Sequence, residues 1–212
     1  MSNEQGAGAD GPKTRKRARK ILLCATGAYV AYGLPRIILQ MIRHIADDVQ
    51  VVLSRTAAKM VSPYSVEVAS RNPVFVEADD RAGGVYVPHI ELSRGVDCIV
   101  VFPATVNILG KVANGIADEL VSTLILAAEV PVIFLPVSND AMLDHPAVQR
   151  NIEILRADGY LVLSPVPGPE VATREGMELM GEGFPLPTLL VQMTAILSDG
   201  GGRARARRNP QK

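Results

Sequence analysis

Two polar residues flank one apolar run of this chain and could carry chemistry. His89 precedes the run at residues 97–103, and Asn107 follows it. Imidazole titrates near neutral pH, so His89 is a candidate general base. A histidine beside an apolar segment is often structural, however, and an asparagine after a strand often only caps a helix. Residue type alone leaves both interpretations open at each position.

Four short loops repeat one pattern, because each follows an apolar run and is rich in small or hydroxyl residues. They are residues 25–29, 54–58, 103–107 and 136–140. Such residues let a ligand approach the backbone and offer N–H and O–H donors. None of the loops has the spacing of a nucleotide P-loop. The candidate ligand contacts in these loops are Gly27, Ala28, Ser54, Thr56, Ala104, Thr105, Asn107 and Ser138.

The elements that must position these loops alternate along the chain. Continuous apolar runs predict strands at 20–26, 49–56, 73–77, 97–103, 130–136 and 160–165, and helical spacing predicts helices at 34–47, 106–128, 146–157 and 187–197. Buried strands that alternate with helices indicate a parallel sheet covered on both faces. We therefore expect a single open, doubly wound α/β domain of about six strands, with its ligand beyond the carboxyl ends of the strands.

Charge is segregated along the chain, although the net charge is zero. Half of its 22 Lys and Arg lie in residues 1–20 and 201–212, and all but two of its 22 Asp and Glu lie between them. These basic ends cannot build a core, so we expect them to be disordered around a folded domain at 21–200. They serve either solubility or capture of an acidic partner. Interleaved aromatic residues are missing, which makes nucleic acid an unlikely partner.

Several motifs together resemble one known family, the homo-oligomeric flavin-containing cysteine decarboxylases. The resemblance rests on H-I-E-L at 89–92, P-A-T-V-N at 103–107, A-N-G-I-A-D-E-L at 113–120 and P-V-S-N-D-A-M-L at 136–143. The loops that follow the first two strands resemble the flavin-phosphate loops of the family. The motifs occur in the family's order and span about residues 20–165.

The resemblance implies a role for each candidate residue. His89 and Asn107 would be catalytic, and Asn139 and Met142 would bind the substrate. Thr105 replaces the usual Ser and keeps the hydroxyl. Two positions depart from the family's clamp, because Ser138 stands where Met is usual and Leu143 where Trp is usual. These departures bear on the shape of the substrate pocket and leave the flavin loops untouched.

The family divides by product. Phosphopantothenoylcysteine decarboxylases carry a cysteine on a flap for a reductive step, whereas the corresponding stretch at 168–187 has none. We therefore expect oxidative decarboxylation of the C-terminal cysteine of a ribosomal precursor peptide to an ene-thiol, as in lanthipeptide-type biosynthesis. The alternatives are a phosphopantothenoylcysteine decarboxylase, a flavin prenyltransferase of the same fold, or a non-catalytic flavin-binding subunit.

The resemblance further implies FMN as the cofactor, with FAD possible, no metal, and assembly as a trimer or a dodecamer. Lys111 could be a catalytic amine, but a place on a helix surface is the simpler interpretation. His44 and His145 have no catalytic context and are expected to be structural or exposed. Cys24 and Cys98 lie in apolar runs, so a disulfide framework is not expected. No secretory signal or membrane-spanning run is visible, and the expected compartment is the cytoplasm.

Overall fold

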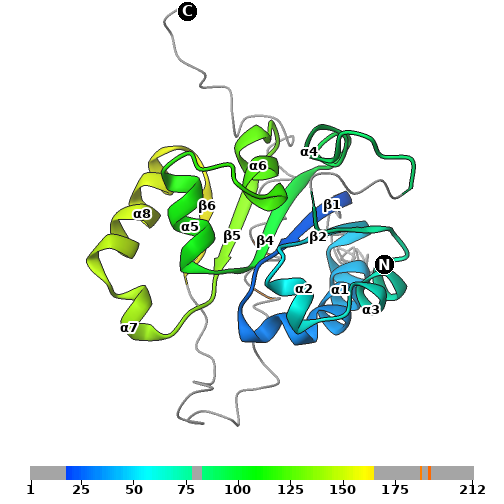
Figure 1. Ribbon diagram of the computed structural model, residues 1–212, viewed down its shortest axis with the longest axis horizontal. Coiled ribbons are helices and arrows are strands. Elements are labelled where there is room, and N and C mark those ends of the chain that lie inside the picture. Colours follow the sequence, from blue (N-terminus) through cyan, green and yellow to red (C-terminus); the bar gives the residue numbers. More distant parts are fainter. Residues whose placement is uncertain (1–17, 78–82, 165–186, 188–190, 192–212) are drawn as a thin grey trace, which may run out of the picture.

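The centre of the protein is a sheet of six parallel strands in a computed structural model that describes residues 18–77, 83–164, 187 and 191 (Figure 1). The strand order is β3-β2-β1-β4-β5-β6. All five neighbouring pairs are parallel. The predicted single domain with a doubly wound parallel sheet is confirmed. The strands are β1 (Ala18–Ala25), β2 (Ala46–Leu53), β3 (Val74–Phe75), β4 (Cys98–Ala104), β5 (Val132–Pro136) and β6 (Leu161–Val162).

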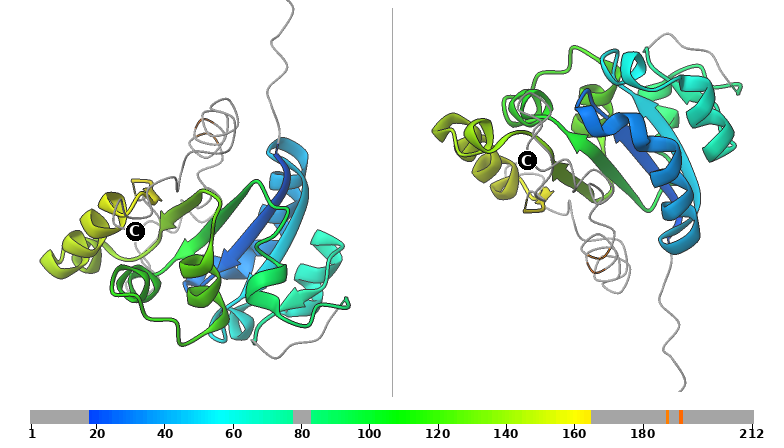
Figure 2. Two further views of the ribbon diagram at one scale, coloured as in Figure 1. Left: turned by 90° about the horizontal axis from the view of Figure 1, so that it is seen from above. Right: turned by 90° about the horizontal axis from the view of Figure 1, so that it is seen from below.

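Two apolar cores lie on opposite faces of the sheet, because neighbouring side chains of a strand point to opposite sides. Within β1, Ile21 and Leu23 belong to one core and Leu22 and Cys24 to the other. Helices α1 (Leu34–His44) and α3 (Pro63–Ser70) cover the first core. The second is covered by α5 (Val106–Ala113), α6 (Leu120–Ala127) and α8 (Pro146–Ala157). Figure 2 shows helices on both faces of the twisted sheet.

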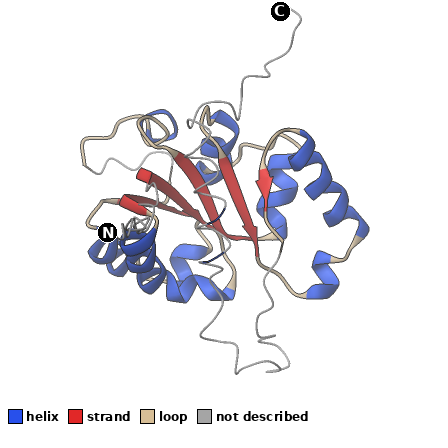
Figure 3. Ribbon diagram, turned by 180° about the vertical axis from the view of Figure 1, so that it is seen from behind, coloured by secondary structure: helices blue, strands red, loops and turns tan. Residues whose placement is uncertain are grey.

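The order of the strands reverses between β1 and β4, which lie side by side although they are far apart in the sequence. Because all strands are parallel, their carboxyl ends lie along one side of the sheet, called the carboxyl edge below. Their amino ends lie along the opposite side, called the amino edge. Three short helices follow strands at the carboxyl edge: the 3₁₀ helix η1 (Tyr29–Gly33), α2 (Ala57–Met60) and α7 (Asp140–Leu143). Another, α4 (Pro88–Glu91), precedes β4 at the amino edge. Figure 3 shows the arrangement from behind.

The predicted single helix at 106–128 is wrong, because the chain forms the two helices α5 and α6. Asn114 ends α5, and Gly115 follows with a φ of 69°, in the left-handed region that favours glycine. A second helix then begins at its own cap. The Glu119 side chain accepts a hydrogen bond from the backbone of Ser122, whose hydroxyl in turn receives one from the Glu119 backbone.

The bounds of other helices and strands differ from the predicted ones by a few residues. Strand β1 begins at Ala18, two residues before the expected start, since the Asp97 carboxylate accepts hydrogen bonds from the backbone N–H groups of Arg19 and Lys20 at 2.6 and 3.2 Å. The first helix ends at His44, because the next residues pair with β1 as part of β2. Of the predicted helix at 187–197, only Pro187 and Val191 are described and both are helical; the rest lies outside the described residues, as do 1–17 and 201–212.

Candidate functional site

Gly27 and Thr56 bring the loops after β1 and β2 into contact at the carboxyl edge. A Cβ atom added to Gly27 would lie 2.3 Å from Thr56 Cγ2 and 2.5 Å from Thr56 Cβ, far inside van der Waals distance. Gly27 is not among the glycines with positive φ, so the reason for glycine here is space rather than backbone conformation. The two loops that resemble phosphate loops therefore form one continuous surface.

The loop after β2 is held by its own serine. Ser54 is 6% exposed, and its hydroxyl accepts a hydrogen bond of 3.2 Å from Ala57 N–H at the start of α2. In the first loop, Ala28 N–H donates to Thr26 O at 2.9 Å. Both predicted loops therefore have defined conformations that lead directly into η1 and α2.

Thr26 joins the first loop to the loop after β4, across the point where the strand order reverses. Its hydroxyl lies 2.6 Å from Pro103 O and 3.1 Å from Thr105 Oγ1. It also accepts a hydrogen bond of 3.0 Å from Thr105 N–H. Thr26 is not among the residues predicted from the sequence, although its place directly before Gly27 at a strand end was a usable signal.

Helix α5 begins at this junction with its first N–H groups uncapped. Thr105 is the N-cap residue, but its side chain makes no capping hydrogen bond and faces Thr26 instead. The amino end of a helix favours anions and hydrogen-bond acceptors. Asn107 in the first turn is exposed, and its side chain makes no hydrogen bond to another described residue. Its carboxamide is thus available to a ligand, whereas Ala104 is a fully buried strand residue.

The loop after β5 carries the predicted clamp residues. Asn139 is the N-cap of α7, and its Oδ1 accepts a hydrogen bond of 2.9 Å from Met142 N–H. Asn139 therefore has the structural role of a helix cap. Its amide N–H₂ group is not used in the cap and can donate to a substrate. Ser138 Oγ lies 3.3 Å from Met142 Sδ. Leu143, which replaces the family's Trp, points into the core and is only 6% exposed.

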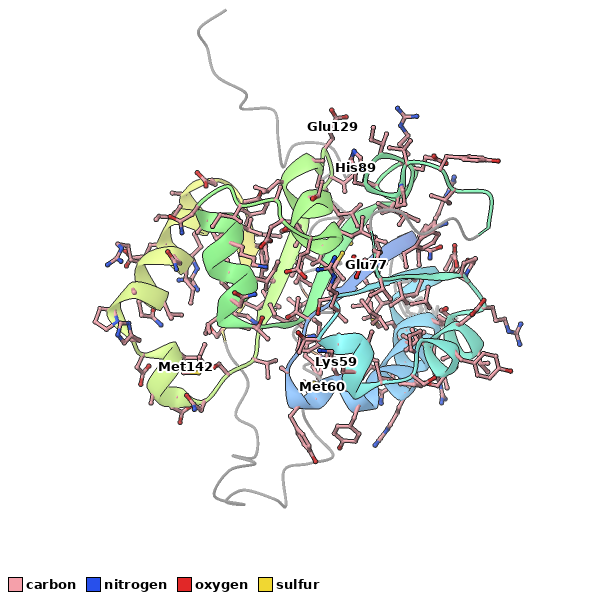
Figure 4. The ribbon with its side chains drawn as sticks, in the orientation of Figure 1. Lys59, Met60, Glu77, His89, Glu129 and Met142 are labelled. Atoms are coloured by element: carbon pink, nitrogen blue, oxygen red, sulfur yellow. The ribbon has the colours of Figure 1, made fainter. Side chains whose placement is uncertain are left out.

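His89 does not join the other candidates. It lies on α4 at the amino edge, whereas Lys59, Met60 and Met142 lie at the carboxyl edge (Figure 4). The seven residues of β4 separate α4 from α5, a span of about 20 Å at the usual rise of a strand. One copy of the chain therefore does not bring His89 and Asn107 together. This agrees with the order of the sequence, in which His89 precedes the strand that Asn107 follows.

Two further residues have structural roles. Lys111 Nζ lies 2.9 Å from carboxylate oxygens of both Asp118 and Glu119, so it links α5 to the start of α6 and is no catalytic amine. The hydrogen bond to Asp118 raises the pKa of Lys111. His145 caps α8, with Nδ1 accepting from Ala147 N–H at 3.1 Å.

Both cysteines are completely buried, as predicted, and lie on strands. Burial raises the pKa of Cys24 to about 12. It also raises the pKa of Cys98, and the charge of Asp97 adds to the effect. Because both are fully buried, neither thiol is open to a ligand.

Among the described residues, no group of three or more His, Cys, Asp and Glu is placed to hold a metal ion. No helix in this part of the chain combines the length and apolar character needed to cross a bilayer.

The carboxyl edge fits a flavin. Gly27 lets the loop after β1 pack directly against Thr56, so a phosphate bound at this edge would lie beside both loops. Thr105 and the uncapped first turn of α5 offer donors and acceptors to a ring system. The residues that would hold the cofactor are thus Gly27, Ala28, Ser54, Thr56 and Thr105.

Comparison with known proteins identifies the class. The family model described as Flavoprotein matches residues 10–182, and the chain belongs to this family. A flavin is therefore the cofactor class, as predicted.

Two curated relatives represent different branches. The coenzyme A biosynthesis bifunctional protein CoaBC of Bacillus subtilis (strain 168) is 37% identical over 150 residues, which are 71% of this chain but only 37% of that protein. Mersacidin decarboxylase of Bacillus sp. (strain HIL-Y85/54728) is 34% identical over 148 residues, which are 70% of this chain and 74% of that protein. The chain thus spans little more than a third of the CoaBC relative.

Solved structures show the same fold. MrsD from Bacillus sp. HIL-Y85/54728 is similar with a TM-score of 0.69 and 31% identity, over 83% of this chain and 96% of that one. The FMN-dependent cysteine decarboxylase TvaF from thioviridamide biosynthesis gives 0.66 and 28%, over 84% and 98%. A variant of EpiD, complexed with the substrate peptide DSYTC, gives 0.67 and 25%, over 74% and 88%.

Proposed function

We propose that this chain is an FMN-dependent decarboxylase that acts on the C-terminal cysteine of a ribosomal precursor peptide and releases an ene-thiol. Family membership and the similarity to mersacidin decarboxylase, TvaF and EpiD support a flavin-dependent cysteine decarboxylase. The choice of a peptide rests on the cysteines, because Cys24 and Cys98 are buried and the stretch at 168–187 has none.

The reaction begins with an oxidation of the cysteine side chain. Bound flavin would supply the hydride acceptor, which turns the Cβ–SH group into a thioaldehyde. The thiol proton must leave in the same stage, and His89 is our candidate to take it. The carboxylate is then β to a C=S bond, so that loss of CO₂ leaves its electron pair in an ene-thiolate.

The other residues hold the substrate during these steps. The Asn107 carboxamide, exposed beside the amino end of α5, would donate hydrogen bonds to the substrate carboxylate. Asn139 would donate through its amide N–H₂ group while its Oδ1 keeps Met142 in place. The contact between Ser138 and Met142 would shape the pocket beside the cysteine.

A second copy of the chain would supply His89. This residue and Asn107 lie at opposite edges of one subunit, so one imidazole and one carboxamide can meet only head to tail between copies. The surface around His89 is apolar, with Tyr86, Val87 and Ile90 all exposed. The carboxyl edge likewise exposes Tyr29 and Met60. Such surfaces favour burial by another copy, in agreement with the expected trimer or dodecamer.

The state of the cysteines favours a peptide substrate. A reductive second half-reaction needs a thiol near the flavin, but Cys24 and Cys98 are buried within strands with raised pKa values. The stretch at 168–187 that would form a flap lies largely outside the described residues and contains no cysteine. The ene-thiol would therefore leave as the product.

Phosphopantothenoylcysteine decarboxylation is the second candidate, and a specific observation favours it. The CoaBC protein of Bacillus subtilis is 37% identical, slightly more than mersacidin decarboxylase at 34%. The altered clamp residues Ser138 and Leu143 do not separate the two candidates.

Mass spectrometry of the product separates the two candidates. The purified holoprotein is offered a peptide that ends in cysteine and, separately, phosphopantothenoylcysteine. We expect the peptide to lose CO₂ and two hydrogens, while the flavin bleaches in the absence of oxygen. Loss of CO₂ alone, or turnover of phosphopantothenoylcysteine and no peptide, would refute the peptide assignment.

A further inference from the structure

The Thr26 hydroxyl links the loops after β1 and β4. Thr26 is 3% exposed, and the residues it contacts are more than seventy positions away in the sequence. Its oxygen lies 2.6 Å from Pro103 O, 3.0 Å from Thr105 N and 3.1 Å from Thr105 Oγ1. A hydroxyl has one proton and two lone pairs, so three contacts use its full capacity.

The direction of each of these hydrogen bonds follows from what the partners can do. Pro103 O is a carbonyl and only accepts, so Thr26 donates its proton there. Thr105 N–H only donates, so it occupies one lone pair of Thr26. The remaining contact then joins the second lone pair of Thr26 to the proton of the Thr105 hydroxyl. Both lone pairs of Thr105 Oγ1 stay free, and Thr105 is only half-buried.

We propose that Thr26 is a positioning residue, which orients the Thr105 hydroxyl as a hydrogen-bond acceptor toward an N–H group of the bound flavin. The same three bonds hold the amino end of α5, and with it Asn107, in register with the flavin loop at Gly27. This inference rests on the proposed function only in taking the ligand of this edge to be a flavin.

The test measures flavin binding and does not depend on turnover. Thr26→Val keeps the shape of the side chain and removes the hydroxyl, while Thr26→Ser keeps the hydroxyl. FMN is titrated into apoprotein of each variant, and the visible absorption bands of the bound flavin are recorded. We expect Thr26→Val to weaken FMN binding by about tenfold or more and to shift the bands. Thr26→Ser should restore both to within about threefold of the original.

A matched control removes an equivalent hydrogen bond elsewhere. Thr123 Oγ1 donates to Glu119 O at 2.9 Å on α6, away from the carboxyl edge. Thr123→Val should bind FMN like the unaltered protein. Equal FMN affinity and equal spectra for Thr26→Val and Thr123→Val would overturn the proposal.

A second variant keeps the test decisive if Thr26→Val does not fold. Thr105→Val retains the bonds of Thr26 to Pro103 O and to the backbone N–H of residue 105, so the junction of the two loops survives. We expect it to melt like Thr123→Val but to bind FMN about tenfold more weakly, with shifted bands. Unchanged binding would refute the acceptor role of Thr105. If these effects appear while no peptide is decarboxylated, the proposed function fails and this inference stands.

Discussion

Replacement of Gly27 by alanine tests whether the loops after β1 and β2 form one cofactor surface. The new Cβ would lie 2.3 Å from Thr56 Cγ2, and carbon atoms in contact are normally separated by about 3.5 Å. The loops must therefore move apart by about 1.2 Å. Overpacking of this kind costs about 1–3 kcal/mol, which corresponds to about 5- to 150-fold if it falls on flavin binding.

The assay is FMN titration of apoprotein, together with thermal unfolding of each variant. Gly33→Ala is the matched control, because its added Cβ would meet only Ile37 Cδ1, at 4.0 Å. We expect Gly27→Ala to bind FMN far more weakly than Gly33→Ala, which should bind like the unaltered protein.

Two double variants, each combining Gly27→Ala with a change at Thr56, test whether contact with Thr56 causes the loss of FMN binding. Thr56→Ser removes Cγ2 but leaves Cβ at 2.5 Å, so it should not relieve the clash. Thr56→Gly removes both atoms, and Gly27→Ala should then cost almost nothing beyond Thr56→Gly alone. If Gly27→Ala weakens FMN binding equally in the presence and in the absence of the Thr56→Gly change, the contact is not responsible and the reasoning is refuted.

Three further predictions follow from other parts of the chain. His89→Asn should keep the flavin and lose about 10²–10⁴-fold in turnover; mixing it with an Asn107→Ala variant under conditions of subunit exchange should restore activity, and no restoration would contradict a shared site. Lys111→Met should destabilise the protein most near neutral pH, as measured by urea unfolding. The hydrogen bond with Lys111 lowers the pKa of Asp118 from 3.8, so the stabilisation is lost as pH falls through that lowered value; the raised pKa of Lys111 means that it is also lost at strongly alkaline pH. A constant difference down to the lowest pH would rule out the ion pair as the cause. Arg71→Gly should stabilise the protein by about 0.5–1 kcal/mol, because Arg71 has a φ of 59°, which glycine adopts without strain. Arg71→Ala removes the charge but keeps Cβ, so it should bring no gain. An equal gain from both changes would show that loss of the charge is the cause.

Much of the fold follows from the sequence, because strands buried on both faces are continuous apolar runs. The runs containing Leu22, Val51 and Val100 predicted three central strands, and each lies in the sheet close to its predicted bounds. Short local signals were weaker. Asn114 and Gly115 could have indicated a helix end, but the apolar residues on either side favoured a continuous helix. One helix was therefore predicted where two form.

The candidate residues of the carboxyl edge were also accessible from the sequence. Small or hydroxyl residues directly after buried strands indicated Gly27, Ser54 and Thr105 as candidates. The sequence could not show that Gly27 touches Thr56 or that Thr26 bonds to Thr105, since these contacts join segments that only the order of strands brings together.

How far His89 lies from Asn107 was decided only by the tertiary structure. In the sequence it precedes the same strand that Asn107 follows, and nothing local distinguishes a site within one chain from a site between two. A parallel strand is a rigid spacer that separates the residues before it from those after it by its full length. The motifs thus determined which side chains are available, whereas the direction of β4 determined that one copy of the chain cannot bring them together.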